Sequence, residues 1–551
     1  MGNFSTAPIF SDGCVLQRNK ECCIFGSADD GQTVSVRIIR NGNVLDENST
    51  RARNGRWITY LGAMDAQENL VLEIRCCGES KTFTDVSVGE VWLAGGQSNM
   101  EFELQNCTEG PEALRLDKEP NVRFYYTPKN SWMDEKFFED ERKSAWQTWD
   151  SEQKGTWSAV GYFFARKLAA DLGVTVGIIG CNWGGTSAAA WMGRERLEKN
   201  SDLKIYLDEQ EEETSGKSVE TQCREYDEYV AYHERWSKKC DELYRKNPSI
   251  EWSEVQEIIG PCRWPGPKSC KNPYRPTGLH DCMIKRIAPY TLKGFLFYQG
   301  ESDDHRPESY YTLFREMIDQ WRSDWNDMLP MVFVQLPEHR YHRDEDFRNW
   351  CLIREAQEKA FRTIAKTGMT VAADLGQYDD IHPRAKKTLG ERMERTALHT
   401  AYGMLDEKSV NGPLFRNAVP RDGLIELHFD FAEDGFTVKD DVQGLENYRH
   451  MEKIHGHKLP DDFTGFEVAG SDGVFHPAEY IFGNMPGNRG TIILKSEKVP
   501  EPVYARYAWY NYGPVSIFGK NGIPLAPFRT YSYINGEKSS GHAEIQQIME
   551  T

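Results

Sequence analysis

Four short runs of mostly apolar residues, each followed by glycine or polar residues, constrain the fold of this chain most strongly. The runs lie at residues 89–94, 174–179, 292–298 and 331–336, and apolar residues at helical spacing mark helices near 158–170 and 310–321. Strands that are apolar on both sides are typical of a parallel sheet covered by helices on both faces. The alternation of strand and helix therefore predicts an α/β layer.

Segments rich in β-strand patterns flank this layer on both sides. Residues 33–39 alternate between apolar and polar side chains and precede the hairpin signal Asn41-Gly42. Further strands are expected at 424–429, 490–495 and 504–509. We expect β-sandwiches at 1–88 and 406–551 around an α/β domain at 89–405. A charged helical stretch at about 195–275 interrupts that domain and is expected to be a solvated insertion near the site.

Composition excludes several classes of function. The 551 residues include 66 Lys and Arg against 85 Asp and Glu, a net charge of -19, so neither nucleic acid nor an anionic membrane surface is an expected partner. There is no apolar run of about 18 residues. The 13 cysteines include no zinc-type pair and are expected to be reduced thiols. The N-terminal residues lack a secretory pattern, which favours the cytoplasm unless a leader has been removed; a homo-oligomer is left open.

The first candidate for chemistry is Gly-Gly-Gln-Ser-Asn-Met at 95–100, directly after the run 89–94. A residue at the carboxyl end of a buried strand lies at the sheet edge where α/β folds bind ligands, and glycines let the chain turn sharply there. Ser98 is therefore a candidate nucleophile. The alternative is that Ser98 only caps a helix.

The second candidate is Asp-Asp-Ile-His-Pro at 379–383. A serine hydroxyl needs a general base, and the imidazole of His382 suits because its pKa lies near neutrality. A carboxylate must then hold one tautomer of the imidazole, and Asp379 or Asp380 can do so within one loop. The alternative is a turn that starts a helix, with His382 at its cap.

Two more loops follow predicted strands. In Tyr-Gln-Gly-Glu-Ser-Asp at 298–303, the Gln299 amide can donate to an oxyanion and Glu301 offers a further acid near the imidazole. In Asn-Trp-Gly-Gly-Thr-Ser at 182–187, the glycines can present a backbone N–H to the same anion. Each loop alone also fits an ordinary turn. Because the carboxyl ends of parallel strands share one edge, the loops together predict a single site.

Six segments in a fixed order carry a family resemblance. They are PIFSDGCVLQ at 8–17, VGEVWLAGGQSNMEF at 88–102, YQGES at 298–302, DIHP at 380–383, RYAW at 506–509 and GIPLAPFRT at 522–530. With these segments the chain resembles, over nearly its whole length, the sialate O-acetylesterase family of the SGNH/GDSL hydrolase superfamily. The resemblance implies an SGNH-type three-layer α/β/α hydrolase core with a parallel sheet, flanked by N-terminal and C-terminal β-sandwich domains.

The resemblance also implies roles for the candidate residues. Ser98 would form an acetyl-enzyme, His382 would be the general base and then the acid, and the oxyanion hole would use the backbone N–H groups of Ser98 and Gly185 with the Gln299 amide. The acid that orients His382 has three candidates, each favoured by a different branch of the superfamily: Asp379, Asp380 and Glu301. Three residues beside these motifs are expected to bind substrate: Asn99, Trp183 and Trp191.

The expected activity is hydrolysis of O-acetyl esters on sugars, of the sialate 9-O-acetylesterase type, with no metal and no organic cofactor. One alternative is an acetylesterase for xylan, xyloglucan or mannan oligosaccharides, since the same catalytic residues would serve. Another is a carbohydrate-binding protein with an inactive hydrolase core, but binding alone has no use for a nucleophile and a base.

Overall fold

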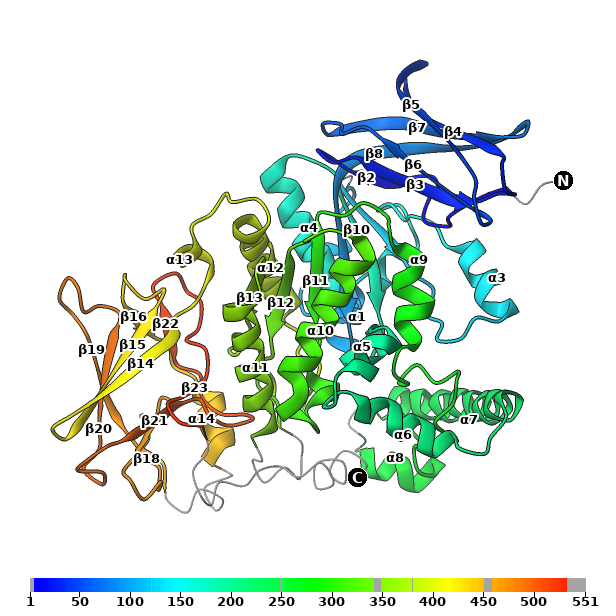
Figure 1. The fold of residues 1–551 in the computed structure, drawn as a ribbon. Helices are drawn as coiled ribbons and strands as arrows, with labels where there is room; N and C mark the ends of the chain where they lie inside the picture. Colours follow the sequence, from blue (N-terminus) through cyan, green and yellow to red (C-terminus); the bar gives the residue numbers. More distant parts are fainter. Residues whose placement is uncertain are drawn as a thin grey trace.

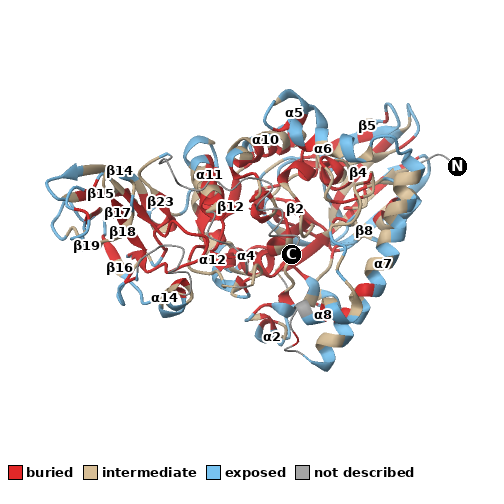
Figure 2. Ribbon diagram, turned by 90° about the horizontal axis from the view of Figure 1, so that it is seen from below, coloured by how far each residue is buried: buried red, intermediate tan, exposed pale blue. Residues whose placement is uncertain are grey.

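The computed structural model describes residues 4–119, 121–247, 250, 252–340, 348–378, 380–449 and 458–532. A central parallel sheet is flanked by an N-terminal and a C-terminal group of β-strands, with a helical lobe at one side (Figure 1). One hydrophobic core runs through all three β-rich parts, and the lobe has a small core of its own. Figure 2 shows this buried interior, with exposed residues gathered on the outer faces of the lobe.

The central sheet has six parallel strands in the order β9-β10-β8-β11-β12-β13. Four of them, β10 to β13, are buried along their whole length, and the first three of these correspond to predicted apolar runs. The strands are β8 (Glu79–Gly96), β9 (Val122–Tyr126), β10 (Val176–Asn182), β11 (Gly294–Tyr298), β12 (Met331–Gln335) and β13 (Thr367–Val371). The prediction of an α/β layer with a parallel sheet is confirmed.

Helices cover both faces of this sheet. Trp92 packs on Phe164, whereas Phe295, which pairs with the next residue of β8, packs on Trp321. Because neighbouring side chains of a strand point to opposite faces, the helices carrying Phe164 and Trp321 lie on opposite sides. One face carries α4 (Ala159–Leu172) packed on α12 (Lys386–Thr400), and the other carries α10 (Pro307–Trp325) packed on α11 (Asn349–Thr363).

The N-terminal strands form two sheets with alternating burial. One has the order β1-β3-β6, and the other joins β5-β4-β7 to β8, with β2 parallel to β8. The strands are β1 (Ser5–Thr6), β2 (Val15–Gln17), β3 (Cys22–Ser27), β4 (Thr33–Arg40), β5 (Asn43–Arg51), β6 (Arg56–Leu61) and β7 (Gln67–Cys76). The boundary expected at residue 88 falls inside β8, which runs unbroken through 18 residues from this part into the central sheet.

The charged insertion that was expected at about 195–275 forms the helical lobe. Its longest helix, α7 (Val219–Lys246), is exposed along most of its length, and its cap Ser218 accepts a hydrogen bond from the backbone N–H of Thr221. The other helices of the lobe are α5 (Arg194–Lys199), α6 (Lys204–Thr214) and α8 (Trp252–Ile259). A segment at 260–275 returns from the lobe to the central sheet.

The C-terminal strands form antiparallel sheets, one with the order β14-β15-β20-β19 and another with the order β18-β17-β21-β23. Phe528 stacks on Phe415 with ring centroids 4.6 Å apart and so joins the two sheets. The strands are β14 (Leu414–Arg421), β15 (Leu424–Asp430), β16 (Phe436–Val438), β17 (Phe466–Ala469), β18 (His476–Pro477), β19 (Glu479–Phe482), β20 (Thr491–Lys495), β21 (Tyr504–Tyr507), β22 (Ile517–Gly519) and β23 (Phe528–Arg529).

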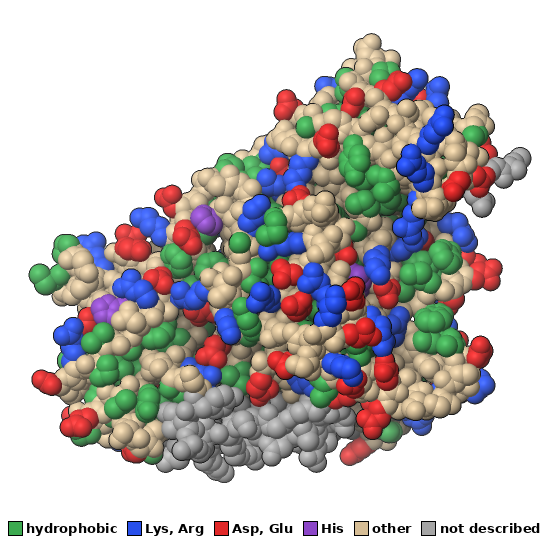
Figure 3. Space-filling view, in the orientation of Figure 1, with side chains coloured by type: hydrophobic (Ala, Val, Ile, Leu, Met, Phe, Trp, Pro, Cys, Tyr) green, Lys and Arg blue, Asp and Glu red, His purple; other side chains and the backbone are tan. Residues whose placement is uncertain are grey.

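Shorter helices complete the order of elements along the chain. They are α1 (Ser98–Glu101), η1 (Leu104–Asn106), α2 (Gly110–Ala113), α3 (Glu135–Lys143), η2 (Lys154–Thr156), η3 (Ala188–Trp191), η4 (His280–Ile284), α9 (Lys285–Ile287), η5 (Glu301–Asp303), α13 (Glu407–Val410) and α14 (Val442–Arg449). Among the described helices, none is long and apolar enough to cross a membrane. The face drawn in Figure 3 carries acidic and basic side chains interspersed.

Candidate active site

Ser98 follows the carboxyl end of β8 and is the first residue of α1. The turn before it depends on Gly96, which has a φ of 133° and whose added Cβ would lie 2.1 Å from the carbonyl oxygen of Tyr298. The next residue, Gln97, donates its backbone N–H to that same carbonyl at 3.0 Å. The first N–H groups of a helix have no acceptor within the helix. The backbone therefore brings Ser98 and its N–H to the sheet edge.

The glycine loop at 183–187 lies directly against Ser98. Trp183 donates its backbone N–H to the carbonyl of Gly96 at 3.0 Å, and an added Cβ on Gly184 would lie 3.2 Å from the Cβ of Ser98. Gly184 donates to the Glu101 carboxylate at 2.6 Å. The N–H of Gly185 has no acceptor in the described part of the chain. Gly185 is therefore positioned as a donor next to the serine.

His382 lies in the loop between β13 and α12. Ser98 and His382 line the same cavity of about 530 Å³, so two segments distant in sequence meet as expected. The described residues lining this cavity are Gln97, Ser98, Glu101, Trp183, Gly184, Gly185, His233, Trp264, Tyr274, Glu301, Ser302, Ile381 and His382. Burial lowers the pKa of His382, while the nearby Asp380 carboxylate raises it and Lys386 lowers it. A base with a lowered pKa is neutral at pH 7, as proton abstraction requires.

The candidate acids differ in their contacts. Asp380 accepts the backbone N–H of His382 at 2.9 Å, which shapes the loop. Glu301 is buried and lines the cavity, with one oxygen accepting from Asn99 at 2.7 Å and the other without a protein partner in the described residues. Burial raises the pKa of Glu301. Asp379 lies outside the described residues.

Asn99 joins the segments that carry Ser98, Glu301 and His382. Its amide nitrogen donates to Glu301 at 2.7 Å and to the carbonyl of Ile381 at 2.8 Å, and its oxygen accepts from Lys386 at 2.5 Å. Lys386 is buried at the start of α12, and burial lowers the pKa of its ammonium group. The residue after Ser98 thus holds the loops of His382 and Glu301 in register.

Gln299 has a different role from the expected one. It is buried outside the cavity lining, and its amide nitrogen already donates to Asp303 at 2.6 Å and to the carbonyl of Thr186 at 3.2 Å. Asp303 in turn accepts the backbone N–H of Ala188 at 2.9 Å. The prediction of Gln299 as an oxyanion donor is wrong in this structure, because both of its donors hold the glycine loop in place instead.

Two of the three expected substrate-binding residues are also corrected. Asn99 is 1% exposed and is occupied by the contacts above, and Trp191 is 0% exposed, with its indole N–H donated to Thr186 at 3.0 Å. Neither can touch a sugar. Trp183 is half-buried and lines the cavity.

No residue-level signal in the sequence marked one wall of the cavity. Trp264 and Tyr274 come from the segment that returns from the helical lobe, and His233 comes from α7. The insertion at about 195–275 was expected near the site, but none of these three residues was singled out. These residues reach the site through packing across long sequence distances, which local patterns do not record.

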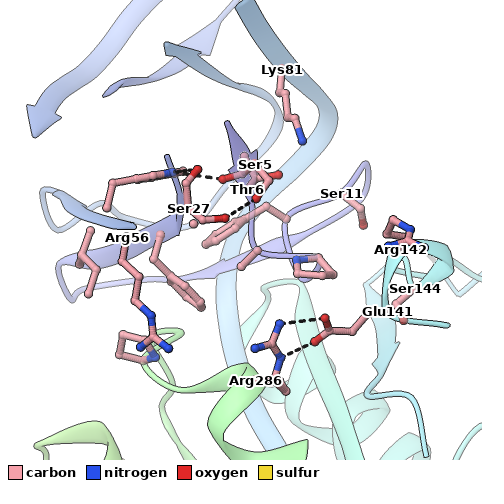
Figure 4. Close-up of a pocket in the computed structure, with 18 of the residues that line it drawn as sticks. Ser5, Thr6, Ser11, Ser27, Arg56, Lys81, Glu141, Arg142, Ser144 and Arg286 are labelled. Atoms are coloured by element: carbon pink, nitrogen blue, oxygen red, sulfur yellow. Dashed lines mark hydrogen bonds and ion pairs between the residues drawn. The ribbon is translucent and has the colours of Figure 1, made fainter. Parts of the chain in front are cut away.

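A second cavity, of about 760 Å³, lies between the N-terminal strands and α3 (Figure 4). Its floor is closed by the ion pair of Arg286 with Glu141, and the hydroxyls of Ser5 and Ser27 bond to each other at 2.6 Å. None of its described lining residues is a histidine, so it holds no serine–histidine pair. Within the described residues there is also no cluster of three or more potential metal ligands.

Known proteins resemble this chain in sequence and structure. Residues 265–399 match the family described as carbohydrate esterase, sialic acid-specific acetylesterase. The sialate O-acetylesterase of Mus musculus is 25% identical over 465 residues, covering 78% of this chain and 79% of the mouse protein. The sialate O-acetylesterase of Homo sapiens is also 25% identical to this chain, and the match covers 75% of this chain and 73% of the human protein. The crystal structure of a carbohydrate acetylesterase from Xanthomonas citri has a TM-score of 0.72 and 26% identity, covering 97% of this chain and 100% of that one.

Proposed function

From its similarity to sialate O-acetylesterases and to a carbohydrate acetylesterase, we propose that this carboxylic ester hydrolase removes O-acetyl groups from carbohydrates through a Ser98 acetyl-enzyme. The observation that carries the proposal is the single cavity lined by Ser98, His382 and Gly185. In the same proposal the central sheet with its helices is an SGNH-type three-layer core, and the strands before and after it form two flanking β-sandwich domains.

The proposed reaction has two halves. His382 takes the proton of the Ser98 hydroxyl as its oxygen attacks the acetyl carbonyl, and the backbone N–H groups of Ser98 and Gly185 stabilise the resulting oxyanion. His382 then gives the proton to the departing sugar oxygen. In the second half His382 takes a proton from water as the water oxygen attacks the acetyl carbonyl. The bond from the acetyl carbon to the Ser98 oxygen then breaks, His382 returns the proton to that oxygen, and acetate leaves.

Asp380 is the carboxylate that we assign to His382. This assignment rests on the position of Asp380, two residues before His382. The Asp380 carboxylate accepts a hydrogen bond from the backbone N–H of His382 and raises the pKa of its imidazole. Glu301 faces the same cavity but is held by Asn99. A comparison of Asp379→Asn, Asp380→Asn and Glu301→Gln separates the three candidates, since the orienting acid should show the largest loss of kcat.

The substitution Ser98→Ala tests the proposed nucleophile. We expect loss of p-nitrophenyl acetate hydrolysis by about 10³-fold or more with an unchanged Tm, since the first step needs the hydroxyl. The matched control is Ser201→Ala, at an exposed position of the insertion, which should keep full activity. If Ser98→Ala keeps most of its activity, the acetyl-enzyme proposal is wrong. A protein that binds acetylated glycans without releasing acetate would instead support the binding-only alternative.

A further inference from the structure

Two aromatic rings from the inserted lobe form the wall of the cavity beside Gly185. An added Cβ on Gly185 would lie 2.9 Å from Cε1 of Tyr274 and 3.1 Å from Cζ2 of Trp264. The Trp264 indole N–H donates to the Tyr274 hydroxyl at 2.9 Å, and the rings meet edge to face with centroids 5.4 Å apart. The wall is therefore fixed in contact with the proposed oxyanion donor.

This wall offers an apolar surface to whatever carries the acetyl group. Trp264 is 44% exposed, unlike the large aromatic residues of the core, and Trp183 also lines the cavity. With an acetyl carbonyl at Gly185, Trp264 and Tyr274 are the nearest side chains against which the esterified group can lie. Aromatic walls with few polar groups are typical of sites that hold a ligand ring by contact with its apolar face.

The described lining of the cavity offers no cation to an anionic ligand. The described lining includes the carboxyl groups of Glu101 and Glu301 and no arginine or lysine. The nearby ammonium of Lys129 already pairs with Glu101, and that of Lys386 is buried and donates to Asn99. A ligand carboxylate would lose its water here without gaining an ion-pair partner, which is unfavourable.

We propose that the substrates are neutral acetylated sugars, selected by stacking on Trp264 and Tyr274, rather than sugars that carry a carboxylate. This inference rests on the esterase function proposed above. It names the substrate class of the same cavity and gives the inserted lobe a role in specificity. Oligosaccharides of neutral pyranoses carrying acetyl esters fit this chemistry.

The charge part of the proposal is tested with a matched pair of substrates. Acetate release is measured from 9-O-acetyl-N-acetylneuraminic acid, from its carboxyl methyl ester, and from acetylated xylo-oligosaccharides. We expect kcat/KM to be at least about tenfold higher for the two neutral substrates than for the free acid, and added salt to narrow the gap. Equal or faster release from the free acid would overturn the inference while leaving the esterase proposal intact. Absence of release from all three and from p-nitrophenyl acetate would instead defeat the esterase proposal.

The stacking part is tested with Trp264→Ala. We expect kcat/KM for acetylated xylo-oligosaccharides to fall about tenfold further than that for ethyl acetate, which carries no ring that could stack on Trp264. The control is Ile258→Ala, an exposed apolar residue of the same lobe outside the cavity lining, which should change neither value. Equal losses on both substrates would show that Trp264 only supports the glycine loop, and the specificity role would be rejected.

Discussion

At the scale of single residues, the protonation of His382 controls the proposed chemistry. Burial lowers the pKa of this imidazole, the Asp380 carboxylate raises it and the Lys386 ammonium lowers it. The base is active when it is neutral, so activity should fall as the pH drops through the pKa of His382. Burial and these two opposing charges together therefore set where the acid limb of the pH profile lies.

Asp380→Asn tests this balance. Asparagine keeps an oxygen that can accept the backbone N–H of His382, but it removes the charge that raises the imidazole pKa. We expect the acid limb of kcat/KM to move to lower pH and kcat to fall by about 10²–10⁴-fold, since the imidazolium loses its counter-charge. The measurement is p-nitrophenyl acetate hydrolysis between pH 4 and 9. Asp117→Asn, at an exposed position, is the control for general loss of charge, and a limb that moves to higher pH would contradict the assignment.

At the scale of elements, α12 connects the site to the face of the sheet that it shares with α4. Its first residue, Lys386, bonds to Asn99 beneath the cavity, and two turns later Glu394 is buried against α4 near Lys167 and Asp171. Burial raises the pKa of Glu394 to about 8. Helix α12 thus places the buried Lys386 next to the site and the buried carboxyl group of Glu394 in its interface with α4.

Glu394→Gln should change how stability depends on pH. The folded protein holds the Glu394 proton up to about pH 8, whereas the unfolded chain releases it near pH 4.5. The folded state then binds more protons between these values, so this residue makes stability fall as pH rises through that window. We expect Glu394→Gln to raise Tm by about 2 °C or more at pH 9 and to leave it nearly unchanged at pH 4.

Thermal unfolding at pH 4, 7 and 9 measures this effect. The matched control is Glu391→Gln, a half-buried residue on the same helix, which should show the wild-type pH dependence. A gain from Glu394→Gln that is the same at all three pH values would mean that the effect is not protonation.

At the scale of the whole molecule, the C-terminal strands are tied to the central sheet through buried polar contacts. Arg354 on α11 is 1% exposed and donates to four backbone carbonyls at 3.0–3.1 Å. Two of the acceptors, Leu336 and Pro337, follow β12, and the other two, Tyr510 and Asn511, belong to the C-terminal part. The catalytic and C-terminal parts should therefore unfold together.

Arg354→Lys tests this connection. An ammonium group cannot reach four carbonyls in the geometry of a guanidinium, so buried acceptors lose their donors. We expect the free energy of unfolding to fall by about 2–5 kcal/mol with a single transition. The control is Arg362→Lys on the same helix, an exposed residue that pairs with Asp430 of β15 and should cost less than about 1 kcal/mol. Two separate transitions in the wild-type protein would contradict the shared unfolding.

Local sequence patterns were sufficient to predict the central parallel sheet and part of the candidate site. The apolar runs became the buried parallel strands because burial on both faces demands apolar side chains at every position. The loops after those strands had to share one edge, and Ser98 and His382 do line one cavity. One predicted strand, at 504–509, ends early as β21 because Ala508 adopts a φ of 47°, which no local pattern marked.

By itself, the sequence determined which segments of the central layer are strands and helices. It also determined which loops lie at the carboxyl ends of the parallel strands, because both depend on the local periodicity of side chains. Only the tertiary structure decided which side chains face the cavity. Gln299 is turned away because Asp303 and Thr186 take its donors, and Trp191 is enclosed in the core. Trp264 and Tyr274 reach the cavity from a lobe far along the chain. Such contacts depend on packing between distant segments, which no local spacing encodes.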